Sequence, residues 1–424
     1  MKFIYKLLSL SLAIACLSGC SAANTEIASS SAATATVDPA TDSTEVPASN
    51  NVFTSAGDGL YVTTDSGIYE LQTVFPDSAN IFYTDANTKE RIFLCANPNC
   101  THADESCPSY IATPSAMFPP MLLRVGDQLL VVFTETTDSS NPHGMLMNMD
   151  GSNRRTVFEL ASNQYMQGGF CTSGNDLYFD LYEIDDSGNV TYQLWYVSFE
   201  NGTSEKVMDL GSDSDHYSLC DGANNELCFN HVSSDGISYC MYNPQSKTIS
   251  DPFFVDSSVS GNSMIQDGYL FVLDEQASSV QRIRLSDKEQ ASASFTVKEG
   301  FGAPSMRYLF DGNLMITEAQ TTASDIPTDG SYGVCSYILD FGTRNCTEFT
   351  LQTPYNNRPV YVLTTIGDAC YVATDYKTYT PTSVSEDGTV SNFDYVANIY
   401  AFITKQDYIN SNQNGYSMVK DAFE

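Results

Sequence analysis

Residues 165–210 read YMQGGFCTSGNDLYFDLYEIDDSGNVTYQLWYVSFENGTSEKVMDL, and this stretch decides the fold class of the chain. Four of its segments alternate or run apolar and are rich in β-branched and aromatic residues, as strands are: YMQGGFCT, DLYFDLYE, QLWYVSF and SEKVMDL. The segments between them are turn sequences, because Gly and Asn tolerate positive φ and Asp and Ser bond the nearby backbone. Helix signals are nearly absent. The stretch therefore predicts four consecutive β-strands.

The same layout returns along the chain after residue 52. Each repeat opens with a cluster of Gly, Asp and Asn that introduces an apolar strand: AGDGLYVTT at 56, VGDQLLVVF at 125, SGNDLYFDL at 173, GANNELCFN at 222, QDGYLFVLD at 266, FDGNLMITE at 310 and IGDACYVAT at 366. The later openings recur every 44 to 56 residues, and only the first interval is longer, at 69. Four strands per repeat at this period predict an all-β β-propeller over residues 53–424. The openings predict seven blades, with six or eight as alternatives, and a sandwich of irregular hairpins is the competing fold.

The first twenty residues have the layout of an export signal. Lys2 and Lys6 precede an apolar run over residues 7–17, which is too short to span about 30 Å of hydrocarbon as a helix. Residues 21–52 are Ser, Thr, Ala and acid with almost nothing to bury, so they predict a disordered tether. As a flexible coil of about 30 residues, this tether would span on the order of 30 Å.

The end of this signal, Leu17-Ser18-Gly19-Cys20, resembles the lipobox of bacterial lipoproteins. The resemblance implies that Cys20 receives a diacylglycerol through its sulfur and becomes the first mature residue. We therefore expect a lipoprotein that is anchored through this lipid to the extracytoplasmic face of a cell membrane. An ordinary signal peptide cut nearby, with Cys20 incidental, is the alternative.

Charge limits the classes of partner. The chain has 52 Asp and Glu against 19 Lys and Arg, a formal net charge of −33. A surface this negative repels nucleic acid, which binds to basic patches. Composition therefore argues against a nucleic-acid partner.

A cluster of metal-ligand residue types lies within LCANPNCTHADESCPSY, in the longer first repeat. Cys95, Cys100, His102 and Cys107 make a Cys₃His set, which is an accepted structural zinc site. The spacing C-x4-C-x-H-x4-C is not a standard finger spacing, and on an export route two of the three cysteines could pair instead. Structural zinc, a disulfide and free thiols are the three alternatives. In each, we expect the cluster to pin an insertion at about 95–115, and not to be catalytic, because four protein ligands leave zinc no open position.

Two further pairs of cysteines flank predicted hairpin turns. Cys228 and Cys240 flank SSDG, and Cys335 and Cys346 flank a turn near Phe341. Both spacings allow cross-strand contact, so they predict two disulfides. Buried thiols that pack as small hydrophobes are the alternative.

Two stretches carry a family resemblance. MLMNMDGSNRRTVFEL, at 145–160, is similar to the strand, Asp-Gly-Ser-Asn turn and strand of TolB-like propeller repeats. The cysteine cluster at 94–110 resembles a pattern in uncharacterised Firmicutes surface lipoproteins that carry such propellers. The resemblance implies a propeller fold and an extracytoplasmic location, and it implies no activity.

Local enzyme signatures are absent from the sequence, which has no Gly-x-Ser-x-Gly elbow, no His-Glu-x-x-His and no phosphate-cradling glycine loop. We therefore expect a non-catalytic binding or scaffold module for a protein, a peptide or a glycan. The alternative is a carbohydrate-active hydrolase or lyase. Its carboxylates would converge from several blades to within about 5 to 10 Å of one another, the separation that glycoside hydrolysis requires.

Overall fold

The computed structural model describes residues 53–421, apart from 56–58, 75–77, 114–118, 138–139, 257–261, 321–332, 380–381, 385–389 and 393–394. The predicted export signal, Cys20 and the predicted tether lie outside the described residues. The described residues belong to one compact unit, Asn50–Glu424. None of their helices is long and apolar enough to cross a membrane.

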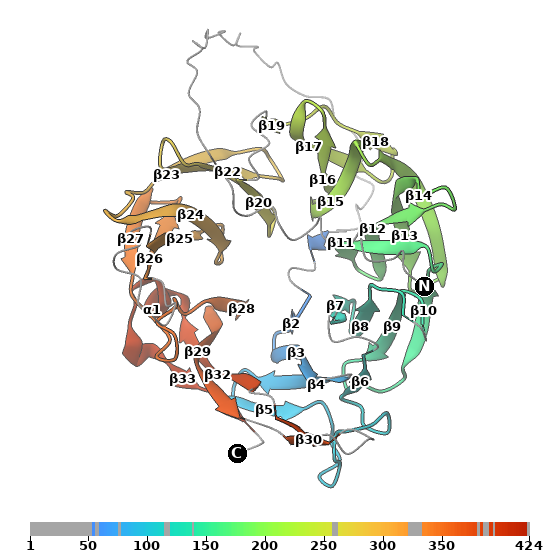
Figure 1. Cartoon of the computed structure of the whole chain (residues 1–424), viewed down its shortest axis with the longest axis horizontal. Helices are drawn as coiled ribbons and strands as arrows, with labels where there is room; N and C mark the ends of the chain where they lie inside the picture. The colour runs from blue at the N-terminus through green and yellow to red at the C-terminus, as the bar shows by residue number, and fades with distance from the viewer. Residues whose placement is uncertain are drawn as a thin grey trace, which may run out of the picture. The chain divides into compact units, whose positions relative to one another are not determined.

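Antiparallel four-stranded meanders follow one another around a ring (Figure 1). The first consists of β2 (Tyr61–Thr63), β3 (Gly67–Val74), β4 (Ser78–Asp85) and β5 (Glu90–Phe93), with β6 (Tyr110–Ala112) also paired to β4. The second consists of β7 (Met121–Val125), β8 (Gln128–Phe133), β9 (His143–Asn148) and β10 (Arg155–Glu159). The third consists of β11 (Gln164–Ser173), β12 (Asp176–Ile184), β13 (Val190–Ser198) and β14 (Thr203–Ser212).

The remaining meanders continue this order. The fourth holds β15 (Asp215–Ala223), β16 (Glu226–Ser233), β17 (Gly236–Asn243) and β18 (Thr248–Ile249), with β19 (Phe254–Asp256) also on β17. The fifth holds β20 (Ser263–Gln266), β21 (Tyr269–Asp274), β22 (Ser279–Arg284) and β23 (Gln290–Ser294). The sixth holds β24 (Phe301–Tyr308), β25 (Leu314–Gln320), β26 (Val334–Asp340) and β27 (Asn345–Phe349). The seventh holds β28 (Val362–Ile366), β29 (Ala369–Tyr379), β32 (Tyr395–Thr404) and β33 (Ser417–Met418).

The other elements are small. They are β1 (Thr54–Ser55), the hairpin of β30 (Thr382–Val384) and β31 (Val390–Asn392), α1 (Lys405–Ile409), the 3₁₀-helix η2 (Gln413–Gly415) and β34 (Lys420–Asp421). The structure thus confirms the predicted all-β propeller fold, and the strands predicted within residues 165–210 are confirmed as β11 to β14. The count of seven blades stays a prediction, because the third and fourth meanders share one continuous sheet through the pairing of β14 with β15.

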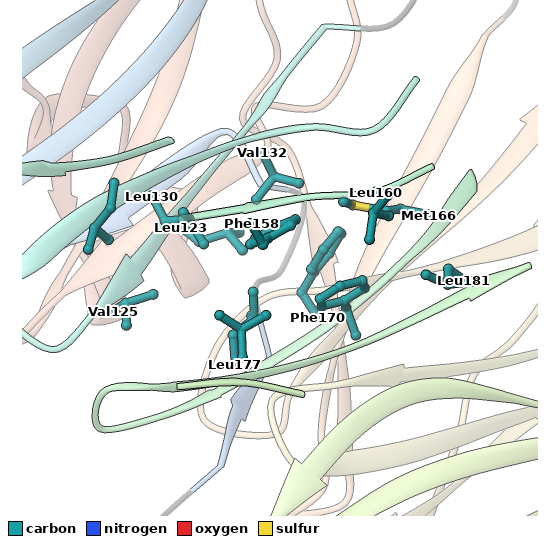
Figure 2. Packing of buried hydrophobic residues seen from close by; sticks show 13 residues of the cluster. Leu123, Val125, Leu130, Val132, Phe158, Leu160, Met166, Phe170, Leu177 and Leu181 are labelled. Carbon is teal, nitrogen blue, oxygen red and sulfur yellow. The ribbon is translucent and has the colours of Figure 1, made fainter. Parts of the chain in front are cut away.

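Apolar side chains fill the seams between neighbouring meanders. Figure 2 shows the seam between the second and third, where side chains of β7, β8 and β10 gather against those of β11 and β12. In β8, Leu130 and Val132 enter this seam, while Leu129 and Val131 enter the seam with the first meander. A strand that is buried on both faces is apolar at every position, which explains the run LLVVF.

The C-terminal strand closes the ring. β34 pairs in parallel with β5, Lys420 lying opposite Glu90. Beside this pairing, Arg91 forms ion pairs with Glu70 at 2.8 Å and with Asp421 at 2.9 Å. The Arg91 and Glu70 side chains are only 3% and 7% exposed. The last described residues are therefore fixed to the first meander by a buried charge pair as well as by strand pairing.

The N-terminal strap, defined here as Phe53, β1 and residues 59–60, lies on the inner side of the ring (Figure 1). The N–H of Phe53 donates to the Asn224 carbonyl at 3.3 Å, and β1 pairs with β11. The Gly59 carbonyl accepts the N–H of Leu122 at 2.5 Å. The strap therefore bonds to the fourth, third and second meanders before the chain enters the first.

The two predicted hairpin disulfides do not form in the structure. Cys228 lies opposite Met241, and Cys240 lies opposite Phe229, so the two thiols point to opposite faces of their hairpin. They enter different apolar seams. Cys346 lies opposite Leu339, four residues along β26 from Cys335. All four cysteines are free thiols; Cys228, Cys240 and Cys335 are buried, and Cys346 is exposed.

Candidate metal centre and channel mouth

The cysteine cluster lies in a loop between β5 and β6. Both strands pair with β4, so the loop projects from the first meander. At the start of the loop the Leu94 N–H donates to the Ile81 carbonyl at 2.9 Å, and at its end the Ser109 carbonyl accepts the Ile81 N–H at 2.8 Å. Because both ends of the loop bond to one residue, its base is fixed.

The loop brings the four predicted ligands together. One donor atom from each of Cys95, Cys100, His102 and Cys107 lies within 4.8 Å of the other three. In a tetrahedral zinc site with Zn–S bonds of about 2.3 Å, donor atoms are about 3.8 Å apart. The described cluster is close to that spacing, so these residues could hold a metal ion.

The imidazole of His102 is held in place by its surroundings. His102 has a φ of 56°, which turns the loop sharply. Its ring stacks on Phe93 with 3.9 Å between centroids, and its Nδ1 lies 3.2 Å from Cys107 Sγ. Its backbone N–H lies 3.4 Å from Cys100 Sγ. The histidine therefore touches two of the thiols, a contact that a simple disulfide loop does not require.

Cys107 is the buried member of the cluster, at 1% exposed. The Ser109 N–H donates to its Sγ at 3.4 Å, and Ser109 Oγ lies 3.1 Å from the same sulfur and donates to Asn80 Oδ1. Burial alone would raise the pKa of this thiol, but hydrogen bonds from Ser109 and His102 outweigh it and lower the pKa to about 6. Such outer contacts orient and tune metal ligands.

Arg154 fixes the loop to the second meander. Its Nη1 donates to the Tyr110 carbonyl at 2.6 Å, its Nη2 to the Pro108 carbonyl, and its Nε to the Gly151 carbonyl at 3.1 Å. Gly151, in the Asp-Gly-Ser-Asn turn, has a φ of 80°, and a Cβ there would lie 2.4 Å from the Pro108 carbonyl oxygen. The cluster thus lies over the seam between two meanders. Sequence spacing could not reveal Arg154 or Asn80, because they reach the loop from other strands and turns.

A second candidate site lies in the channel. A cavity of about 940 Å³, the channel-mouth cavity, is lined by residues from the innermost strand of every meander: Val62, Leu123, Thr172, Ala223, Gln266, Tyr308 and Leu363. Its volume is within the range of ligand pockets. It reaches the turns that follow these strands, where Gly126, Gly174 and Gly268 expose backbone in place of side chains. The Gly/Asp/Asn clusters of the sequence mark these turns, although their place at a channel mouth could not be inferred.

The acids at the channel-mouth cavity are already bonded. Asp221 is 1% exposed, and its two oxygens accept the N–H groups of Gly222 at 2.7 Å and Gly268 at 2.8 Å. Burial raises the pKa of Asp221 to about 6. Asp267 accepts the hydroxyl of Tyr308. Both carboxylates therefore already accept hydrogen bonds within the protein.

Comparison with known proteins bears on the fold alone. No protein-family model and no curated protein matches the chain. Among solved structures, the chain is similar to puromycin hydrolase at 11% identity and a TM-score of 0.43, with 81% of this chain and 58% of that chain covered. It is also similar to TolB from Acinetobacter baumannii, at 10% identity and a TM-score of 0.31, with 80% and 78% covered. The propeller domain of the Trilobed protease from Pyrococcus furiosus is similar at 12% identity and a TM-score of 0.36, with 72% and 99% covered. The chain spans just over half the length of puromycin hydrolase, and scores at this level carry no argument about function.

Proposed function

We propose that this chain is an extracytoplasmic lipoprotein whose propeller is a non-catalytic binding module, with its ligand site in the channel-mouth cavity. The observation that carries the proposal is a ligand-sized cavity whose acids, Asp221 and Asp267, are committed to structural hydrogen bonds. Of the described residues that line the cavity, the two acids already accept hydrogen bonds within the protein, and this supports binding over acid–base hydrolysis.

Membrane attachment belongs to the same proposal. The lipobox-like end of the export signal supports a diacylglycerol on Cys20, and the polar stretch to residue 52 supports a tether between lipid and propeller. The module would then work close to the outer face of a membrane. Fractionation of cells that express the full chain tests this step. The wild type should sediment with membranes and the Cys20→Ala variant should not, and equal distribution of the two would remove the anchor from the proposal.

We further assign a structural zinc ion to Cys95, Cys100, His102 and Cys107. Three thiols and an imidazole suit zinc, and four protein ligands leave it no position for a substrate. Arg154 lies close enough to offset the negative charge of a Cys₃His site. When bound, zinc would cross-link the four ligands of the loop and would not take part in a reaction. The residues of the loop would hold the Pro108–Tyr110 backbone against the second meander.

The binding proposal is tested by site-specific photo-crosslinking on the anchored protein. A photoreactive residue replaces Thr365, which lines the channel-mouth cavity, and in a control it replaces Asp186, which is exposed in the turn at the far end of β12. We expect one discrete adduct from position 365 and none from position 186. Equal labelling at both positions, or turnover of labelled glycans by the wild type, would overturn the proposal.

A further inference from the structure

The N-terminal strap is bound to the ring in the way that an extended peptide binds to a sheet edge. β1 pairs antiparallel with β11, with Thr54 opposite Thr172. On one side of β1, Phe53 donates a backbone hydrogen bond to Asn224, and on the other side Gly59 accepts one from Leu122. Main-chain bonds of this kind give affinity in strand addition without specifying side chains.

One side chain of the strap fills a specific pocket. Phe53 is 8% exposed and belongs to the apolar cluster between the third and fourth meanders. Its ring meets Tyr178 edge to face, with 5.5 Å between centroids. The floor of the pocket is Gly222, where an added Cβ would lie 2.4 Å from the Cβ of Phe53. The pocket therefore exists only because residue 222 has no side chain.

The Phe53 pocket is continuous with the channel-mouth cavity. Phe53 and Gly222 themselves line that cavity, together with Tyr269 and Tyr308 across the channel. The strap bonds to the inner wall at the second, third and fourth meanders, and the cavity is lined by the innermost strands of all the meanders. A segment seated like the strap would therefore border the cavity.

We propose that this inner wall is a docking site for extended peptides that carry an aromatic residue, and that the strap occupies it in cis. The inference rests on the proposed binding function and names its ligand class. The ligand would add to the edge of β11 that β1 occupies and place its aromatic side chain on Gly222. The strap residues Phe53, Thr54 and Ser55 are uncharged. Because the chain has a net charge of −33, neutral or cationic peptides would be favoured over acidic ones.

Because the strap occupies the docking site in the same chain, it lowers the apparent affinity of the wild type for a free peptide. A short covalent connection holds the strap at an effective concentration in the millimolar range, so a free peptide at micromolar concentration cannot displace it. Replacing Phe53 by Ala removes the side chain that fills the pocket and leaves the pocket itself intact. Replacing Gly222 by Ala would place a Cβ 2.4 Å from the Cβ of the residue seated there, so it opposes any side chain at that position, an aromatic one included.

The test uses the full chain and a fluorescein-labelled peptide of residues 50–60, NNVFTSAGDGL, with binding followed by fluorescence anisotropy. We expect the peptide to bind the Phe53→Ala variant at least tenfold more tightly than it binds the wild type. The peptide NNVATSAGDGL should not bind either protein. The Phe53→Ala/Gly222→Ala double variant should bind neither peptide, because its pocket is filled.

The outcomes separate the alternatives. If Phe53→Ala keeps the circular dichroism and melting temperature of a folded propeller but does not bind NNVFTSAGDGL, the docking site is refuted. Binding that survives in the double variant refutes the role of the Gly222 pocket. If Phe53→Ala fails to fold, Phe53→Leu replaces it in the test, because leucine fills the pocket less completely than phenylalanine. Phe53→Leu must then bind NNVFTSAGDGL more tightly than the wild type does. Equal affinities for the two proteins would again refute the site. Adducts at position 365 alongside failure of this test would keep the proposed binding function and discard only its peptide ligand.

Discussion

The carboxylate of Asp221 accepts the backbone N–H of Gly268 at 2.8 Å, across the seam between the fourth and fifth meanders. Asp180 makes the equivalent link one seam earlier, where it accepts the N–H of Leu219 at 3.0 Å. In both places a buried acid of one meander satisfies a peptide group of the next. Those N–H groups would otherwise be buried without a partner. Neighbouring meanders are thus joined by hydrogen bonds to carboxylates as well as by apolar packing.

These acids make stability depend on pH. Burial raises the pKa of Asp180 to about 7 and that of Asp221 to about 6. A carboxyl group whose pKa is higher in the folded than in the unfolded chain holds a proton that the unfolded chain has released. The free energy of unfolding therefore falls as the pH rises from about 4 towards 7. For Asp180 we expect a fall of about 2 kcal/mol between pH 5 and pH 7.

Urea unfolding at these two pH values checks the prediction. Asp180→Asn cannot ionise, so its free energy of unfolding should change less between pH 5 and pH 7 than that of the wild type. Asp186→Asn, in an exposed turn, should behave as the wild type does. A wild type and an Asp180→Asn variant with the same pH dependence would show that Asp180 does not titrate in this range.

The alternation of strand and turn was enough to predict the fold, because it is a local property. β11 to β14 can be predicted from residues 165–210, because each strand has its own alternation of apolar and polar residues and each turn contains Gly, Asn or Asp. The gathering of the metal-ligand set was also predictable, because all four residues lie in one loop. The roles of Asp180, Asp221 and Arg154 were not, because each bonds to backbone of another meander. The Cys228–Cys240 pair failed because loop length does not fix which face of the hairpin each thiol takes. The Cys335–Cys346 pair failed because loop length does not fix the register of the two strands.

Ring closure should depend on Arg91. Replacing it with Ala leaves Glu70 buried without its cationic partner, and breaking a buried pair in this way costs about 3 to 5 kcal/mol. Asp421→Asn removes the other ion pair, in which the aspartate is 30% exposed, and should cost about 1 kcal/mol or less. Denaturant unfolding of the three proteins gives these differences. Equal losses for the two variants would mean that Glu70 gains another partner.

Metal binding should depend on the four cluster residues of the loop and not on the other cysteines. Native mass spectrometry of the protein purified without chelator is expected to show one zinc ion per chain. Cys107→Ala and His102→Ala should lose the ion, while Cys346→Ala, an exposed cysteine outside the cluster, should retain it. Chelation should lower the melting temperature of the wild type and leave that of Cys107→Ala unchanged. A metal-free wild type would contradict the zinc assignment, and a mass that is also short by two hydrogen atoms would indicate a disulfide.

The seam beside Asp180 should tolerate added volume poorly. A Cβ on Gly169 would lie 2.2 Å from the Leu219 carbonyl oxygen and 2.7 Å from Asp180 Oδ1, so Gly169→Ala must push the third and fourth meanders apart. We expect a loss of about 3 kcal/mol, the upper range for overpacking. Gly174→Ala is the matched control, because Gly174 has a φ of 59° but nothing within 4 Å of an added Cβ. It should lose only about 1 to 2 kcal/mol through its left-handed backbone. Thermal unfolding of both variants decides the point, and a smaller loss for Gly169→Ala than for Gly174→Ala would show that the seam can open without cost.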